Sequence, residues 1–338
     1  MSTYREPAPA PTAPEAALSA AALRVAFPGS RGHAGARAVD GVNLDVGRGE
    51  IVALVGESGC GKTTLARALL GLQRPTSGTV RFHGRPLAAT TRHLRAYRRR
   101  VQFVLQDPHG SLNPRHTVYD AVAEGLRIHY GTTADETEQV AAALSRAGLR
   151  PPERFFLAYP HELSGGQRQR VVIAGALVLH PELIVADEPV ASLDASVRGE
   201  ILQLLLRLRD ELELAALVVT HDLGLAWNIA DRVAVMYLGR VVEVGPVEEV
   251  LTAARHPYTR ALLSVLPESG AAEPTVLAGE PPDPARVPGG CRFHPRCPAL
   301  ASGMADRAGV AQRCRTEEPA IAPGGSTPHI ACHLFPAE

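Results

Sequence analysis

The sequence has 338 residues, and its 35 lysines and arginines equal its 35 aspartates and glutamates. A chain without net charge has no overall field to draw it to nucleic acid or anionic lipid, so we expect local recognition and no nucleic-acid partner. Its apolar runs fall far short of the roughly 20 residues that cross a bilayer, which excludes a membrane-spanning role.

The N-terminal segment is rich in proline and alanine and lacks the basic start and apolar core of a secretory signal. We expect residues 1–20 to form a disordered leader on a cytosolic protein. Three segments with glycine-rich turns then predict an antiparallel sheet edge, at residues 23–27, 39–46 and 79–82.

Short β-branched runs alternate with helical patterns in the next part of the chain. The runs lie at residues 51–55, 183–186 and 216–220, and the helical patterns that follow them lie at 62–70, 195–212 and 223–230. This alternation predicts an α/β fold with parallel strands and crossover helices. Between residues 107 and 180 the strand signals fade, and helix formers at 117–128 and 136–147 predict an inserted helical subdomain.

The length suits one large domain with an appendage, because single cores stop growing near about 250 to 300 residues. No internal repeat is visible, so we assign residues 21–252 to one domain and residues 253–338 to a C-terminal extension. Residues 267–290 are rich in proline, glycine and alanine, which suits a linker within that extension.

A glycine-rich segment follows the apolar run at 51–55 and opens a helix, the context typical of a phosphate-binding loop. Its residues are Gly56, Glu57, Ser58, Gly59, Cys60, Gly61, Lys62, Thr63 and Thr64. The glycines let backbone N–H groups curl around phosphates, Lys62 neutralises their charge, and the Thr63 hydroxyl can bind Mg²⁺. An ordinary glycine-rich turn is the alternative. We expect Cys60 to be a small packing residue rather than a reactive thiol.

Two carboxylates, Asp187 and Glu188, follow the run at 183–186. Side chains placed where a strand leaves the core can face a bound nucleotide. Asp187 suits coordination of Mg²⁺, and Glu188 is placed to polarise the water that attacks the γ-phosphate. Alone, such a pair is usually a solvated turn, but together with the phosphate loop it predicts a P-loop ATPase.

Between these motifs lies a signature segment of five residues: Leu163, Ser164, Gly165, Gly166 and Gln167. With it the sequence resembles the ABC ATPase family, from about residue 23 to residue 252. The resemblance implies that this segment contacts the γ-phosphate of ATP held by a partner domain, so that two domains enclose two ATP molecules head to tail. The chemistry is reasonable, because a serine hydroxyl and glycine amides at the start of a helix, expected near Arg168, form an anion site.

Other residues stand where the ABC ATPase family has functional ones. The resemblance implies that Gln106 senses Mg²⁺ and the attacking water, and that His221 contacts the γ-phosphate. Phe27 stands where the family often has an aromatic residue stacked on adenine, although tyrosine is commoner there. The loop that crosses the dimer interface matches three residues: Ser192, Leu193 and Asp194.

The C-terminal extension carries a more discriminating resemblance. Residues 256–263, HPYTRALL, and residues 291–297, CRFHPRC, are similar to the C-terminal region of oligopeptide and dipeptide importer ATPases. That family also includes some nickel and glutathione importers. The resemblance implies ATP-driven uptake of di- or oligopeptides, with nickel, glutathione or another small solute left open as cargo.

Four of the five cysteines lie in this extension, at Cys291, Cys297, Cys314 and Cys332. Intervals of 5, 16 and 17 residues separate them, whereas a structural zinc site usually begins with a closer pair. A reducing compartment disfavours disulfides. Some family members hold an iron–sulfur cluster with this pattern, so we favour a [4Fe-4S] cluster over zinc, with unliganded thiols as the third alternative.

The resemblance implies an ATPase that uses ATP and Mg²⁺ at the cytoplasmic face of the cell membrane, as a peripheral subunit. Its implied partners are a second ATPase subunit, identical or homologous, two permease subunits and, indirectly, an extracellular solute-binding protein. ABC ATPases of DNA repair or translation are an alternative, but they usually carry long coiled-coil insertions or two ATPase domains, and this sequence has neither. A module that holds ATP without turnover is opposed by the intact Glu188 and His221.

Overall fold

The computed structural model of the chain describes residues 16–29, 35–191, 193–266, 275–321 and 329–335, so most of the predicted leader lies outside the described residues. Strand β1, Ala16–Phe27, begins before the expected domain boundary at residue 21. Leu18 of this strand is buried and pairs with β2 on one side and β4 on the other. The leader prediction was therefore wrong for residues 16–20, which are part of a sheet.

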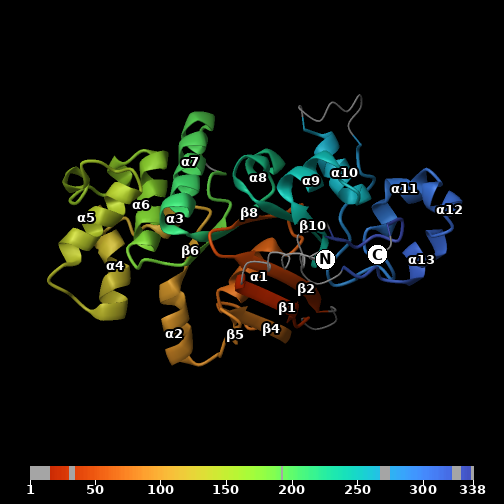
Figure 1. Cartoon of the computed structure of the whole chain (residues 1–338), viewed down its shortest axis with the longest axis horizontal. Helices are drawn as coiled ribbons and strands as arrows, with labels where there is room; N and C mark the ends of the chain where they lie inside the picture. The colour runs from red at the N-terminus through yellow and green to blue at the C-terminus, as the bar shows by residue number, and fades with distance from the viewer. Residues whose placement is uncertain (1–15, 30–34, 192, 267–274, 322–328, 336–338) are drawn as a thin grey trace, which may run out of the picture.

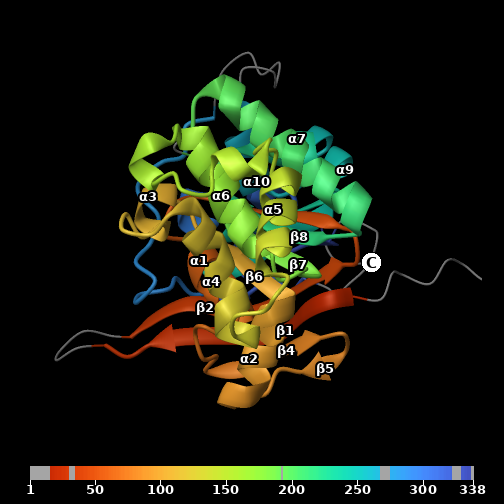
Figure 2. The same cartoon turned by 90° about the vertical axis from the view of Figure 1, so that its left-hand side faces the viewer.

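The antiparallel edge predicted from the sequence is a four-stranded sheet with the order β2-β1-β4-β5. Its other strands are β2 (Ala36–Gly47), β4 (Ser77–Phe82) and β5 (Arg85–Pro86). In Figure 2 this sheet lies below the rest of the molecule, with its apolar side toward helix α1.

The main sheet has the order β11-β10-β9-β3-β8-β7-β6 within the described residues. Five strands pair in parallel: β3 (Ile51–Val55), β6 (Val101–Val104), β7 (Leu183–Asp187), β8 (Ala215–Thr220) and β9 (Arg232–Tyr237). Two strands add to one edge in antiparallel pairing: β10 (Arg240–Pro246) and β11 (His329–Ile330). Every residue of β3, β7 and β8 is buried, which explains their continuous apolar sequences.

Strand β3 separates two cores. Its alternate residues Ile51, Ala53 and Val55 belong to a core formed with the helices above the sheet, and Val52 and Leu54 belong to a core formed with α1 and the antiparallel sheet. This division follows from the two-residue period of a strand, which sends successive side chains to opposite faces.

The helices follow the predicted pattern, with two differences. Helix α7 has the predicted bounds, Ala195–Leu212, and α1 covers Lys62–Leu69. The helix expected near Arg168 is α6, which begins three residues earlier and covers Gly165–Leu177. Helix α2, Thr91–Arg100, was not foreseen. The remaining helices of the domain at residues 21–252 are α3 (Pro108–Ser111), α4 (Val118–Tyr130), α5 (Glu136–Arg146), α8 (Leu223–Ile229) and α9 (Val247–Thr252), and α10 (Pro257–Ser264) belongs to the extension.

Helices α3 to α6 form the subdomain at the left of Figure 1, and the C-terminal extension lies at the opposite end. The extension contains the 3₁₀ turn η4 (His294–Arg296) and three short helices, α11 (Pro298–Ala301), α12 (Met304–Arg307) and α13 (Ala311–Thr316). It is joined to the main body by β11 and by Phe293, which is only 1% exposed. The α/β fold with an antiparallel sheet and an inserted helical part is thus confirmed.

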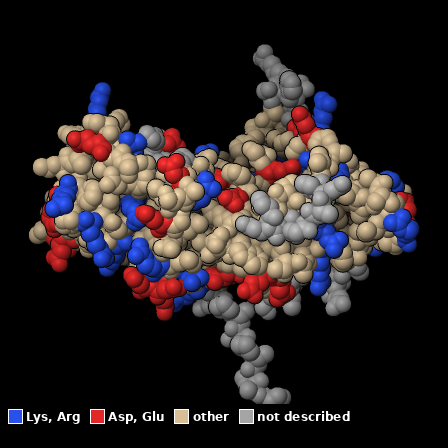
Figure 3. Space-filling model, turned by 90° about the horizontal axis from the view of Figure 1, so that it is seen from above, with Lys and Arg blue, Asp and Glu red and all other residues tan. Residues whose placement is uncertain are grey.

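The surface agrees with the balanced composition. Figure 3 shows basic and acidic side chains interspersed over the face seen from above, without a large area of one sign. Within the described ranges, no helix combines the length and the apolar character needed to span a bilayer.

Candidate functional site

A cavity of about 630 Å³ opens beyond the carboxyl ends of β3, β7 and β8. This is the edge at which parallel α/β sheets bind ligands. Phosphate-loop residues line it, with Cys60 as the exception, and four residues predicted from separate motifs join them: Gln106, Asp187, Glu188 and His221. The structure therefore brings together residues that are up to 165 positions apart in the sequence, as counted from Gly56 to His221.

The phosphate loop needs glycine at two positions where other parts of the chain approach closely. A Cβ atom on Gly56 would lie 2.2 Å from the Met236 carbonyl oxygen, and one on Gly61 would lie 2.0 Å from the Ala38 carbonyl oxygen. The φ angles of these glycines are 155° and 108°, values that residues with a side chain rarely adopt. The loop is thus held in a curled shape, and backbone amides of such a loop can surround a phosphate group.

Lys62 is 8% exposed and folds back on the loop. Its Nζ donates to the Gly56 carbonyl oxygen at 2.6 Å and to the Glu57 carbonyl oxygen at 3.0 Å. Its cationic group is therefore held at the mouth of the loop, where phosphate oxygens can replace carbonyl oxygens as acceptors. Cys60 lies behind the loop, and burial raises the pKa of its thiol, as expected for a packing residue.

Asp187 ends strand β7 and faces Thr63. Burial raises the pKa of the Asp187 carboxyl, and a hydrogen bond with the Thr63 side chain and the nearby Lys62 oppose that rise. A carboxylate and a hydroxyl side by side are oxygen ligands that suit Mg²⁺, which usually keeps several waters and uses substrate phosphates as further ligands. The Thr63, Asp187 and Gln106 side chains all line the cavity, so this donor set fits the ion.

Glu188 has the strained backbone often found at functional positions. Its φ is 48°, in the left-handed region. The Thr220 hydroxyl donates to Glu188 Oε2 at 3.2 Å, and the His221 ring nitrogen Nδ1 lies 2.6 Å from Oε1. The Glu188 side chain is 13% exposed and His221 is 67% exposed. The carboxylate is thus oriented from behind, while the imidazole lies toward the open side of the cavity.

Phe27 is not among the residues that line the cavity. It ends strand β1 and is 41% exposed, so its predicted stacking on adenine stays a prediction.

The signature segment lies at the N-terminus of α6, outside this cavity. Ser164 caps the helix: its Oγ accepts from the Gln167 backbone N–H at 3.2 Å, and Gln167 Oε1 accepts from the Ser164 N–H at 2.9 Å. Gly165 is partly exposed, Gly166 packs against Val197, and Leu163 is buried. The exposed serine hydroxyl can still donate to a group that approaches from another chain.

Of the predicted dimer loop, Leu193 is buried and Asp194 is exposed at the start of α7, whereas Ser192 lies outside the described residues. The structure does not bring these residues into the cavity.

The predicted iron–sulfur cluster is not supported. All four cysteines of the extension are described, and among the described residues no group of three or more His, Cys, Asp or Glu side chains is arranged to hold a metal ion. Burial raises the pKa of each of these thiols, for Cys291 to about 12 and for Cys332 to about 11. Without such an arrangement of ligands, neither the cluster nor the zinc alternative receives support from the described residues.

Sequence reasoning missed three residues that line or support the site. Ala38 limits the space at Gly61, Leu262 of α10 lines the cavity, and the Tyr258 hydroxyl accepts from the Glu57 backbone N–H at 2.9 Å. Only Tyr258 and Leu262 had a signal, since both belong to the HPYTRALL motif, whose contact with the phosphate loop no pattern could show.

Comparisons with known proteins agree with this geometry. Residues 39–191 match the family model described as ABC transporter, and residues 242–302 match that described as oligopeptide/dipeptide transporter, C-terminal region. A putative peptide import ATP-binding protein of Brucella ovis is 46% identical over 79% of this chain and 85% of its own. The oligopeptide transport ATP-binding protein AppF of Bacillus subtilis is 41% identical over 88% of this chain and 90% of its own. Among solved structures, the dimeric ATP-binding cassette MJ0796 bound to ADP and Pi has a TM-score of 0.61 and 30% identity, covering 68% of this chain and 98% of that one.

Proposed function

This chain belongs to the ABC transporter family as an ATPase, and from that premise we propose that it hydrolyses ATP to drive the uptake of di- or oligopeptides. The ATPase activity follows from the family and from the cavity. The cargo rests on the C-terminal match at residues 242–302 and on relatives named for peptide import.

The observation that carries the proposal is the meeting of Lys62, Thr63, Asp187 and Glu188 in one cavity behind a preformed phosphate loop. In the mechanism, loop amides and Lys62 bind the β- and γ-phosphates. Glu188, oriented by Thr220, accepts a hydrogen bond from the attacking water, and His221 donates to the γ-phosphate. Mg²⁺, held by Thr63, Asp187 and Gln106, would neutralise the charge that develops on the phosphate oxygens.

The assembly is a second part of the proposal. The signature residues of one chain would complete the ATP site of another, identical or homologous, and residues 192–194 would lie at their interface. Support comes from the exposed hydroxyl of Ser164 and from the similarity to a dimeric cassette. Two permease subunits, supplied with cargo by a solute-binding protein, would then anchor the pair at the cytoplasmic face of the membrane.

We also propose the domain limits expected from the sequence, with a revised start for the first domain. The nucleotide-binding domain would begin at residue 16 rather than 21, with the helical subdomain at about 107–180, and the extension would follow from residue 253. We propose no cluster chemistry for its four cysteines, because the described residues show no arrangement that fits such a group.

The test combines hydrolysis with uptake. We expect Glu188→Gln to reduce ATP hydrolysis by at least about 100-fold, the usual contribution of a catalytic proton acceptor, without loss of ATP binding. The matched control is Glu211→Gln, an exposed position near the end of α7. Hydrolysis by Glu188→Gln at the wild-type rate would remove that residue from its role.

Uptake of a labelled di- or tripeptide is then measured in cells that carry the chain with its permeases. Loss of uptake with Glu188→Gln supports peptide cargo. Unchanged uptake contradicts it and directs the search to nickel, glutathione or another small solute. Failure of the chain to copurify with permease subunits would favour an ABC ATPase without a membrane partner.

A further inference from the structure

The C-terminal extension touches the phosphate loop directly. Arg296, in the turn η4, forms two parallel bonds to the carboxylate of Glu57, with Nη1 2.8 Å from Oε2 and Nη2 3.2 Å from Oε1. The Arg296 side chain is 7% exposed and that of Glu57 is 27% exposed. A bidentate pair of this kind is strong and fixes the orientation of both groups. It joins residues separated by 239 positions in the sequence.

Glu57 is held on its backbone as well. Its N–H donates to the hydroxyl of Tyr258, a residue of α10 that is fully buried. The Tyr258 ring lies 4.7 Å from the ring of Tyr237 and 5.4 Å from that of Phe293. Phe293 in turn lies 5.2 Å from Tyr237. The loop therefore rests on an aromatic cluster to which the extension contributes two rings, those of Tyr258 and Phe293.

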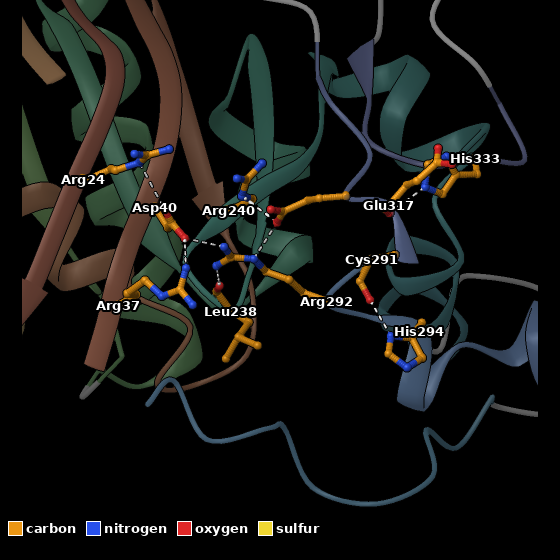
Figure 4. A network of polar contacts seen from close by, with 11 residues as sticks. Arg24, Arg37, Asp40, Leu238, Arg240, Cys291, Arg292, His294, Glu317 and His333 are labelled. Atoms are coloured by element: carbon orange, nitrogen blue, oxygen red, sulfur yellow. Dashed lines mark hydrogen bonds and ion pairs between the residues drawn. The ribbon is translucent and has the colours of Figure 1, made fainter. Parts of the chain in front are cut away.

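A second arginine anchors the segment that carries Arg296. Figure 4 shows Arg292 pointing from the extension toward Asp40 and the backbone of Leu238. Its Nη1 donates to the Leu238 carbonyl oxygen at 2.7 Å, and its Nε donates to Glu318 at 2.8 Å. The Arg292 side chain is 5% exposed. Arginines on both sides of the buried Phe293 thus fix the extension against the domain that binds nucleotide.

The charge of Glu57 explains why such a partner is useful. Its side chain belongs to the loop and lines the cavity that would receive the phosphates. An unpaired carboxylate there would repel the anionic triphosphate, and the repulsion would be strong in a partly desolvated site. Arg296 cancels this charge without entering the cavity, since it is not among the lining residues.

We propose that Arg296 is a positioning residue through which the C-terminal extension sets the ATP affinity of the phosphate loop. It does so by neutralising the Glu57 carboxylate, which the two parallel bonds hold in place. The inference rests on the proposed ATP site, because it concerns the affinity of that site for the same ligand.

The test is the affinity of the full chain for ATP, measured by calorimetry with EDTA present to prevent hydrolysis. We expect Arg296→Gln to weaken ATP binding about tenfold, because it leaves Glu57 charged and unpaired. Arg296→Lys keeps the charge but not the bidentate geometry, so its affinity should fall by no more than about threefold. The control is Arg313→Gln, which breaks an exposed ion pair with Glu317 in the same extension and should leave binding unchanged.

The decisive measurement is the double variant Glu57→Gln/Arg296→Gln. If Arg296 acts by neutralising Glu57, removing both charges restores affinity to within about threefold of that of Glu57→Gln alone. A double variant that binds ATP as weakly as Arg296→Gln overturns the proposal, since it assigns Arg296 a purely structural role. Should Arg296→Gln fail to fold, as judged by near-ultraviolet circular dichroism, Arg296→Lys decides: a loss of tenfold or more then overturns the proposal.

The two proposals fail differently. If the wild-type chain itself does not bind ATP, or binds it no better than Lys62→Ala, the proposed function fails. If the wild type binds ATP and Arg296→Gln binds it equally well, only the role of Arg296 is overturned.

Discussion

Two helix N-termini in this chain are proposed to bind phosphate, and they are built in opposite ways. Helix α1 begins after Gly61, which provides no side-chain cap, so its first amides are left open. Helix α6 begins after Ser164, whose capping box with Gln167 already satisfies two of the free N–H groups. The first terminus lies in a cavity, and the second lies outside it.

The difference shows which part of the proposed ATP site a single chain can form without a partner. The phosphate loop is backed by Met236, Ala38 and Tyr258, so its receptive shape exists before ATP arrives. At the N-terminus of α6, the side chains of Ser164 and Gln167 already form hydrogen bonds with backbone N–H groups. The Ser164 hydroxyl can therefore add a contact to a phosphate group, but this terminus cannot bind a phosphate alone. We therefore expect the two sites to respond differently to substitution.

The largest effect is expected at the phosphate loop. Lys62→Ala removes the cation that we propose binds the phosphates, so the affinity of the isolated chain for ATP should fall roughly 100-fold. Calorimetry with ATP and EDTA measures this loss, and the folding of the variant is checked by circular dichroism. ATP binding at wild-type affinity would contradict the assignment of α1 as the principal phosphate site.

The sequence could predict the features of these two helix N-termini that depend on residues close together in the sequence, but not those that depend on residues far apart. The sequence predicted that the phosphate loop, Asp187 and Glu188 act together because each motif is local in the sequence and specific in its chemistry, and the structure places them around one cavity. The support from Tyr258 could not be predicted, since that residue lies 201 positions from its partner Glu57. The start of α6 was placed too late because Gly165 and Gly166 resemble a turn, whereas Ser164 caps a helix there.

The fold was predictable to a similar degree. Continuous apolar runs predicted the buried parallel strands, but residues 16–20 were assigned to a leader. Their alanines have little intrinsic preference for strands. Pairing of β1 with both β2 and β4 makes them a strand, and such pairing is a tertiary effect.

A smaller effect is expected at the signature terminus. Ser164→Arg should leave ATP binding by the single chain within about twofold of wild type, because Ser164 lies outside its cavity. Hydrolysis by the assembled pair should fall about tenfold or more, since a bulky cation replaces the hydroxyl that we propose contacts the ATP of the partner chain. The control is Ser302→Arg, an exposed position in the extension. Equal loss of binding and hydrolysis would show that the two termini serve one site.

The smallest effect concerns the support behind the loop. His256 is buried against Phe293, with ring centroids 5.7 Å apart, and burial lowers the pKa of its imidazole to about 3. The unfolded imidazole takes up a proton below its ordinary pKa of 6.5 while the folded one stays neutral, so acid favours unfolding. Between pH 7 and pH 5.5 this group should cost about 1 kcal/mol of stability.

Urea unfolding of wild type and His256→Asn at both pH values checks this expectation. Asparagine can cap α10 as His256 does, by accepting from the Tyr258 N–H, but it does not titrate. The variant should lose less stability on acidification than the wild type. Equal losses would mean that His256 is not the group that responds.

Lys62 is the only lysine in the sequence, since every other basic residue is an arginine. The chain therefore carries one side-chain amine, and that amine lies in the phosphate loop with 8% exposure. A reagent that acylates amines would meet only Lys62 and the α-amino group. Mass spectrometry of the labelled protein would then report occupancy of the loop directly, with no need to engineer a probe or to resolve competing sites.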